Sequence, residues 1–142
     1  MQTFVFRCRS CRAEVTTPVR EVPLPHGAKA PCDMSRGQVC PPRLPPGAFA
    51  VERFEEAGRG ARRPRPAPVL NPGDLRGTRH TDDPARLNGC CGLDGTDGPN
   101  LLCARCGAEL ATESSDCWTW QQTVLLPEAV ERVTLPGRRS GR

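Results

Sequence analysis

The sequence predicts a mainly β protein, a small antiparallel domain with long loops rich in proline and glycine. Short runs of β-branched and aromatic residues alternate with polar ones and end at prolines, as half-buried strands do. The 142 residues include 16 Pro and 14 Gly, which leaves little room for long helices. Only 4 Phe, 2 Trp and no Tyr are available for burial, so the core is thin and needs a further cross-link.

The N-terminal half predicts two strands and a long insertion. Residues 2–8, QTFVFRC, predict a strand, and residues 13–22 predict its returning partner, which ends at prolines. A low-complexity insertion is expected at about residues 23–68. Within it, AFAVERF at 48–54 fits either a strand or a short helix, and the basic segment GRGARRPRPAP at 58–68 predicts a solvated, disordered linker.

The C-terminal half predicts short elements separated by turns. VLNPGDLRG (69–77) predicts a strand and a turn, and DDPARLNG (82–89) predicts one helical turn that begins at a proline. WTWQQTVLLP (118–127) predicts a strand and PEAVERV (127–133) a brief helix. We expect a single domain over residues 1–135 and a disordered tail over residues 136–142.

One cysteine motif occurs twice. CRSCRAEVTT at residues 8–17 aligns without a gap with CARCGAELAT at residues 103–112. Both copies follow an apolar run, and both continue into Ala-Glu and a branched aliphatic residue. The repeat therefore predicts two equivalent hairpins that face one another. Gly107, after the second hook, suits the left-handed turn of such hairpins, whereas Arg12 occupies the same place in the first and predicts a looser hook.

Two such hooks predict one metal centre. Zn²⁺ in structural sites takes four ligands in a tetrahedron, and each Cys-x-x-Cys turn directs two sulfurs at one point. The zinc ligands are therefore predicted to be Cys8, Cys11, Cys103 and Cys106. Four thiolates around Zn²⁺ leave a net charge of about −2, which neighbouring arginines would offset; these are Arg7, Arg9, Arg12 and Arg105.

Three other uses of the cysteines stay open. Two metals would combine the first hook with Cys32 and Cys40, and the second hook with two of Cys90, Cys91 and Cys117. A thioredoxin-like redox hook would need a βαβ unit, and neither hook precedes a convincing helix. Iron could replace zinc among four thiolates.

The stretch NGCCGLDGTDGPN, residues 88–100, has a glycine at every third position and several strong turn pairs. It predicts a tight loop, or the wall of a ligand pocket with Cys90 or Cys91 as a reactive thiol. Trp118 and Trp120 are two residues apart and would share one face of a strand, either as core or as an aromatic surface near Cys117. Cys90, Cys91, Cys117, Trp118 and Trp120 are thus the candidate ligand or reactive site.

Charge and targeting signals restrict the partners. The net charge is +4, and Lys29 is the only lysine among 20 basic residues, a bias that a GC-rich genome produces anywhere. The sequence shows no export signal and no membrane span, so we expect a cytoplasmic protein that keeps its cysteines as thiols or metal ligands. His26 and His80 are predicted to be loop residues and not metal ligands.

A strand, a Cys-x-x-Cys hook, a long insertion and a second hook followed by aromatic residues resemble the β-tent zinc folds. These include the Yippee proteins, the ligand-binding domain of cereblon and zinc-bearing methionine sulfoxide reductase B. The resemblance covers residues 2–17 and 88–126. It implies two sheets joined by one zinc, and a ligand or partner on the open side. The third tryptophan of the cereblon cage and the His-plus-Cys set of the reductase are absent.

The function predicted from these features is a binding module of unknown small ligand or protein partner, with a structural Zn²⁺. One alternative is a thiol redox or reductase-type enzyme that uses Cys90, Cys91 or Cys117. Another is a zinc ribbon that binds RNA or the ribosome through its arginines. Phosphate-binding glycine loops, HExxH and GxSxG do not occur in the sequence, so no catalytic residue is nominated.

Overall fold

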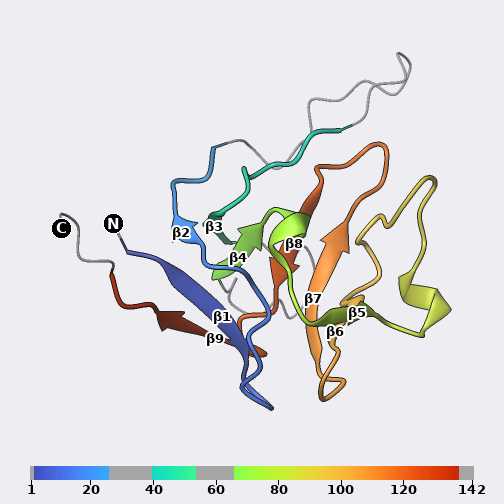
Figure 1. Cartoon of the computed structure of the whole chain (residues 1–142). Helices are drawn as coiled ribbons and strands as arrows, with labels where there is room; N and C mark the ends of the chain where they lie inside the picture. The colour runs from blue at the N-terminus through green and yellow to red at the C-terminus, as the bar shows by residue number, and fades with distance from the viewer. Residues whose placement is uncertain (1, 26–39, 54–65, 138–142) are drawn as a thin grey trace.

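The computed structural model describes residues 2–25, 40–53 and 66–137. Two β-sheets make up the domain (Figure 1). A ribbon of two strands lies on one side, and a sheet of seven strands in the order β2-β3-β4-β8-β7-β6-β5 forms the rest. The predicted small, mainly β domain is confirmed. The described residues contain no helix long and apolar enough to cross a membrane.

The two-stranded ribbon joins the first and last strands of the chain. β1 (Phe4–Cys8) pairs antiparallel with β9 (Val130–Thr134), from Phe4 opposite Thr134 to Cys8 opposite Val130. Residues 127–133 had been predicted as a brief helix, and this is wrong. A turn at Pro127–Ala129 leads straight into β9, because β1 offers five backbone partners and the β-branched Val130 and Val133 suit a strand.

The larger sheet is mixed. β2 runs parallel to β3, and every other neighbouring pair is antiparallel. Its strands are β2 (Arg20–Glu21), β3 (Ala48–Arg53), β4 (Pro66–Leu70), β5 (Thr78–His80), β6 (Leu101–Cys103), β7 (Glu109–Ser114) and β8 (Gln122–Leu125). Two short 3-10 helices, η2 (Pro72–Asp74) and η3 (Pro84–Arg86), begin at prolines. The second is the helical turn predicted for residues 82–89, and the side chain of Asp83 caps it.

Several predicted boundaries shift. Residues 13–22 form a strand only at β2, and elsewhere they reach β1 through isolated bridges at Glu14 and Val19. Residues 48–53 form a strand rather than a helix. The predicted linker 58–68 is wrong at its C-terminal end, where residues 66–68 belong to β4; residues 58–65 lie outside the described residues. The predicted tail is described only to Gly137.

The core lies between the ribbon and the larger sheet. Phe49 of β3 is fully buried, and its ring meets the rings of Phe4 and Phe6 edge-to-face at 5.8 and 5.2 Å. Such aromatic pairs contribute about 1 kcal/mol each beyond the area they bury. Cys8 and Cys103 are part of the same buried cluster. The two sheets therefore meet through three aromatic rings and through cysteines.

Candidate metal centre

The first hook is a tight turn at the end of β1. The amide of Cys8 donates to the carbonyl oxygen of Ala13 at 2.8 Å, and the amide of Arg12 donates to the carbonyl of Cys8 at 2.7 Å. Arg12 has a φ of 68°, the only positive φ at a non-glycine residue in the described ranges. A side chain in this left-handed region costs about 1 kcal/mol or more.

The second hook, between β6 and β7, repeats this pattern. The amide of Cys103 donates to Ala108, and the amide of Gly107 donates back to Cys103, both at 2.8 Å. Gly107 has a φ of 80° and adopts it without a side-chain penalty. The two hooks are therefore equivalent in backbone structure. The first keeps this geometry although Arg12 stands where the second has glycine.

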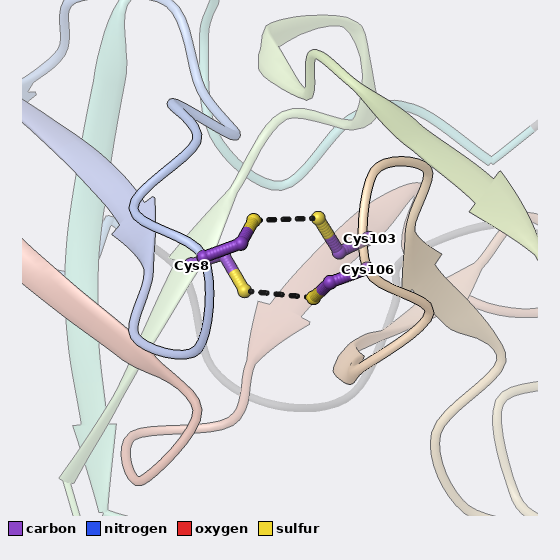
Figure 2. A group of neighbouring side chains, drawn as sticks. Cys8, Cys103 and Cys106 are labelled. Atoms are coloured by element: carbon purple, nitrogen blue, oxygen red, sulfur yellow. Dashed lines mark hydrogen bonds between the residues drawn. The ribbon is translucent and has the colours of Figure 1, made fainter.

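The hooks bring their four sulfurs together (Figure 2). Cys8 Sγ lies 3.6 Å from Cys106 Sγ, and Cys11 Sγ lies 3.6 Å from Cys103 Sγ. All four sulfurs are within 4.8 Å of one another. In Figure 1 the turn after β1 and the turn between β6 and β7 lie side by side at the lower edge of the molecule.

These distances suit a metal ion and exclude a disulfide. Four sulfurs about 2.3 Å from a central ion in a tetrahedron are about 3.8 Å apart, and 3.6 Å is close to that edge. A disulfide bond would be about 2.05 Å. Cys8 and Cys103 are buried, while Cys106 is exposed, so the site lies at the rim of the core. The tetrad could therefore hold a metal ion without rearrangement.

The hooks also prepare two of the sulfurs electrostatically. The backbone amide of Ala108 lowers the pKa of Cys106 to about 7, with help from the other three sulfurs and against partial desolvation. The amide of Ala13 acts in the same direction on Cys11, but desolvation and the neighbouring sulfurs outweigh it and raise the pKa of Cys11 to about 11. One ligand thus ionises readily, while another needs a metal ion to displace its proton.

The arginines beside the hooks have other partners. Arg7 pairs with Glu14 at 3.7 Å and Arg12 with Glu131 at 3.6 Å. Arg9 donates to the carbonyl oxygen of Val130 at 2.9 Å. The positive charge of Arg7 and Arg12, predicted to offset the thiolates, is therefore shared with neighbouring carboxylates. Arg9 and Arg12 also hold the turn against β9.

A second group of sulfurs gathers at another place. Cys90, Cys91 and Cys117 are free, and their sulfurs lie within 4.8 Å of one another. The buried carboxylate of Asp116 accepts the backbone amides of all three at 2.8 to 2.9 Å. Burial by itself would raise the pKa of Asp116, but these hydrogen bonds lower it below its usual range. Asp116 was not predicted as a site residue, because the sequence places it beside Cys117 but does not show that it faces the glycine-rich loop.

Trp118 and Trp120 do not share a face. The segment before Gln122 is a turn rather than a strand, so Trp120 is buried while 46% of Trp118 is exposed. The Trp118 indole Nε1–H donates to Asp116 at 2.9 Å. Trp120 therefore belongs to the core, and Trp118 lies beside the second cysteine group.

The remaining candidates separate from both groups. Cys40 is buried and disulfide-bonded, so the expectation that every cysteine is a thiol or a ligand is wrong there. Its sulfur lies 3.1 Å from the carbonyl oxygen of Cys117, a contact without a thiol proton. His80 pairs with Glu113 at 3.3 Å. Cys32 and His26 lie outside the described residues.

Comparison with family models, with curated proteins and with solved structures finds no match to this chain. The assignment of the four-cysteine group as a candidate metal site therefore depends on its geometry and chemistry alone.

Proposed function

We propose that this chain is a binding module whose β domain is held together by one structural Zn²⁺ at Cys8, Cys11, Cys103 and Cys106. The observation that carries the proposal is the convergence of four sulfurs from two hooks about a hundred residues apart in sequence (separations of 98 and 92). Four thiolates in a closed tetrahedron, without room for substrate or water, are typical of structural rather than catalytic zinc. Iron is the other ion that four thiolates bind, and its visible absorption distinguishes it.

The ion would fix the ribbon on the larger sheet. One pair of ligands lies at the end of β1 and in the turn after it, and the other lies at the end of β6 and in the turn that leads to β7 of the larger sheet. Among the described residues, the rings of Phe4, Phe6 and Phe49 are the main aromatic contact between the same two bodies. Metal binding therefore sets the separation of the ribbon and the sheet.

A groove lies between these two bodies. It has a volume of about 290 Å³, near the lower end of small-ligand sites. Its apolar walls come from Phe6 and Val130 of the ribbon and from Phe49 and Val51 of β3, with prolines from β4. Arg9 and Arg132 also line it. Arg132 pairs with Glu21 at 3.1 Å and Arg9 donates to the carbonyl oxygen of Val130, so an anionic ligand would share these two arginines with their present partners. An apolar groove with two arginines in its lining fits a ligand that joins a hydrophobic ring to an anionic group.

The β-tent resemblance, with its ligand on the open side of two sheets joined by zinc, stays a prediction. The groove between the ribbon and β3–β4 is where such a ligand would lie in this chain.

The metal part of the proposal is tested by elemental analysis. Protein purified without added metal and dialysed against a weak chelator is expected to retain one equivalent of zinc. A folded protein without metal would contradict the structural role of the ion. A visible absorption band together with one equivalent of iron would show that the bound ion is iron and not zinc.

The binding part is tested by ligand-observed NMR with pairs of small aromatic compounds. The two members of a pair differ only in that one carries a carboxylate and the other the corresponding amide. The carboxylates are expected to bind more tightly. Val51→Glu places an anion in the groove and is expected to abolish their binding. Leu87→Glu is the matched control, because Leu87 lies outside the groove and is as exposed as Val51 (38% and 37%). Equal binding to both variants would refute the groove as the site.

A further inference from the structure

The second cysteine group has a construction of its own. Cys90 and Cys91 come from the glycine-rich loop before β6, and Cys117 comes from the turn after β7. Two segments 26 residues apart in sequence thus bring three free sulfurs within 4.8 Å of one another. Cys90 and Cys91 are exposed and Cys117 is half-buried, so the sulfurs are accessible from solvent.

Asp116 fixes the backbone of all three cysteines. Its side chain is fully buried, and its two oxygens accept the amides of Cys90, Cys91 and Cys117, together with Gly92 at 3.3 Å and the indole of Trp118. A single carboxylate therefore sets the positions from which the three sulfurs converge. Hydrogen bonds that hold ligand-bearing segments in this way are a regular part of metal sites.

The glycines of the loop allow this close packing. A Cβ on Gly92 would lie 2.5 Å from the carbonyl oxygen of Ser115, and one on Gly89 would lie 1.7 Å from the carbonyl of Gly92. Neither position has room for a side chain. The glycine spacing noted in the sequence thus brings Cys90 and Cys91 against the segment that carries Cys117.

The sulfur geometry suits a three-coordinate ion. Three sulfurs about 2.3 Å from an ion at the centre of a triangle are about 4.0 Å apart. Cys90 Sγ and Cys91 Sγ are 3.9 Å apart. Thiolates select soft ions such as Cu⁺ and Zn²⁺, and a three-ligand site leaves a position open for a fourth ligand.

We propose that Cys90, Cys91 and Cys117 form a second metal site, which binds one Cu⁺ or Zn²⁺ through three thiolates. The site is separate from the tetrad. Cys103 and Cys106 precede β7 and Cys117 follows it, so the six residues of that strand, about 20 Å long, lie between the two. The accessible sulfurs fit an ion that is exchanged, whereas the tetrad fits an ion that is retained.

The proposal is tested on the zinc-loaded protein, after the chelator dialysis that leaves one equivalent. Zn²⁺ is added in one arm, and Cu⁺ with a chromophoric competitor under anaerobic conditions in the other. Elemental analysis after gel filtration is expected to show one additional equivalent in at least one arm. Cys90→Ser and Cys91→Ser are expected to lose only this additional equivalent and to keep the retained zinc and the fold, since both side chains are exposed.

Asp116→Asn tests whether the hydrogen bonds of Asp116 are needed to position the three thiols for metal binding. It keeps all three sulfurs but weakens the acceptor that positions them, and a 10- to 100-fold loss of affinity is expected. Asp94→Asn is the matched control, because Asp94 lies in the same loop but accepts from Thr96 instead. If Asp116→Asn does not fold, the two exposed cysteine variants still decide the proposal.

Three results would overturn the proposal. The protein could take up no additional equivalent in either arm, or Cys91→Ser could take up as much as the parent. Thiol counting could also show that two of the three cysteines form a disulfide in air and exclude metal, which would make the group a redox pair. Loss of the retained zinc in Cys8→Ser concerns the tetrad only, so failure of one site is distinguishable from failure of the other.

Discussion

If the tetrad holds the proposed structural Zn²⁺, replacing one of its cysteines in either hook is expected to unfold the domain. Cys8 and Cys103 are both fully buried in the main core cluster, and each supplies one of the four sulfurs. Structural Zn²⁺ contributes on the order of 10 to 16 kcal/mol to the folding of small metal domains, whereas whole domains are stable by about 5 to 15 kcal/mol. Losing a thiolate removes most of that contribution. Cys8→Ser and Cys103→Ser should therefore behave alike, although they lie at opposite ends of the chain.

Circular dichroism with chelator titration measures this. The parent is expected to unfold cooperatively as zinc is extracted, while both variants are unfolded, or unfold at far lower chelator concentration. Cys91→Ser is the control, since it also removes a cysteine sulfur but lies outside the tetrad. A Cys8→Ser protein that stays folded and zinc-loaded would refute a structural centre that needs all four ligands, because the remaining sulfurs would then suffice to hold the ion and the fold.

Three further outcomes follow from single contacts. Cys40→Ser removes a buried disulfide cysteine and is expected to lower the free energy of unfolding in urea by about 2 kcal/mol. The zinc content should stay unchanged. An unaffected urea midpoint would show that the disulfide does not contribute to stability. Gly107→Ala, at a φ of 80°, is expected to cost about 1 kcal/mol, whereas Gly137→Ala, which meets no atom within 4 Å, should change nothing. Zinc uptake at pH 8 is expected to release at least the proton of Cys11, because the pKa of that thiol is raised to about 11. The affinity for zinc should therefore fall as the pH falls. A pH-indicator dye that detects no released proton on zinc addition would contradict this.

The two cysteine hooks were predictable because they are local. Each hook is closed by hydrogen bonds between residues at most five apart, so the same residue types at the same offsets give the same turn twice. The meeting of the two hooks followed from the demand of one ion for four ligands. The one local error concerned Arg12, which takes the left-handed conformation that glycine takes in the other hook. The hydrogen bonds that close the hook hold Arg12 in this conformation.

The second cysteine group was only partly predictable, because a distant carboxylate builds it. The sequence singled out the glycine spacing and the cysteines, but it gave no means of knowing that Asp116 would turn inward and accept five N–H groups. The same carboxylate explains the error at Trp118, because its bond to the indole and to the amide of Cys117 holds residues 116–118 in a turn. A strand would have needed the backbone amide of Cys117 for a neighbouring strand.

Tertiary pairing decided the other errors. Residues 127–133 carry good helix formers after a proline, yet a helix of seven residues is marginal alone, and β1 supplies a full set of strand partners. The buried Arg43 was not anticipated either. It forms a two-pronged ion pair with Glu52 at 2.7 and 2.8 Å, which fixes the segment before β3 onto that strand. Both outcomes depend on a partner segment as well as on local sequence preference.

Metal and ligand should act on one another through the ribbon. Under the proposed function, the ion fixes β1 against the larger sheet, and the groove has one wall on β1 and β9 and the other on β3 and β4. A ligand that needs both walls binds only the metal-held arrangement, so it stabilises that arrangement by RT ln(1 + L/Kd), where L is the free ligand concentration. Linkage is reciprocal. An occupied groove must therefore raise the affinity of the protein for zinc by the same factor by which bound zinc raises the affinity for the ligand. The second cysteine group, beyond the far end of β7, should be indifferent to the same ligand.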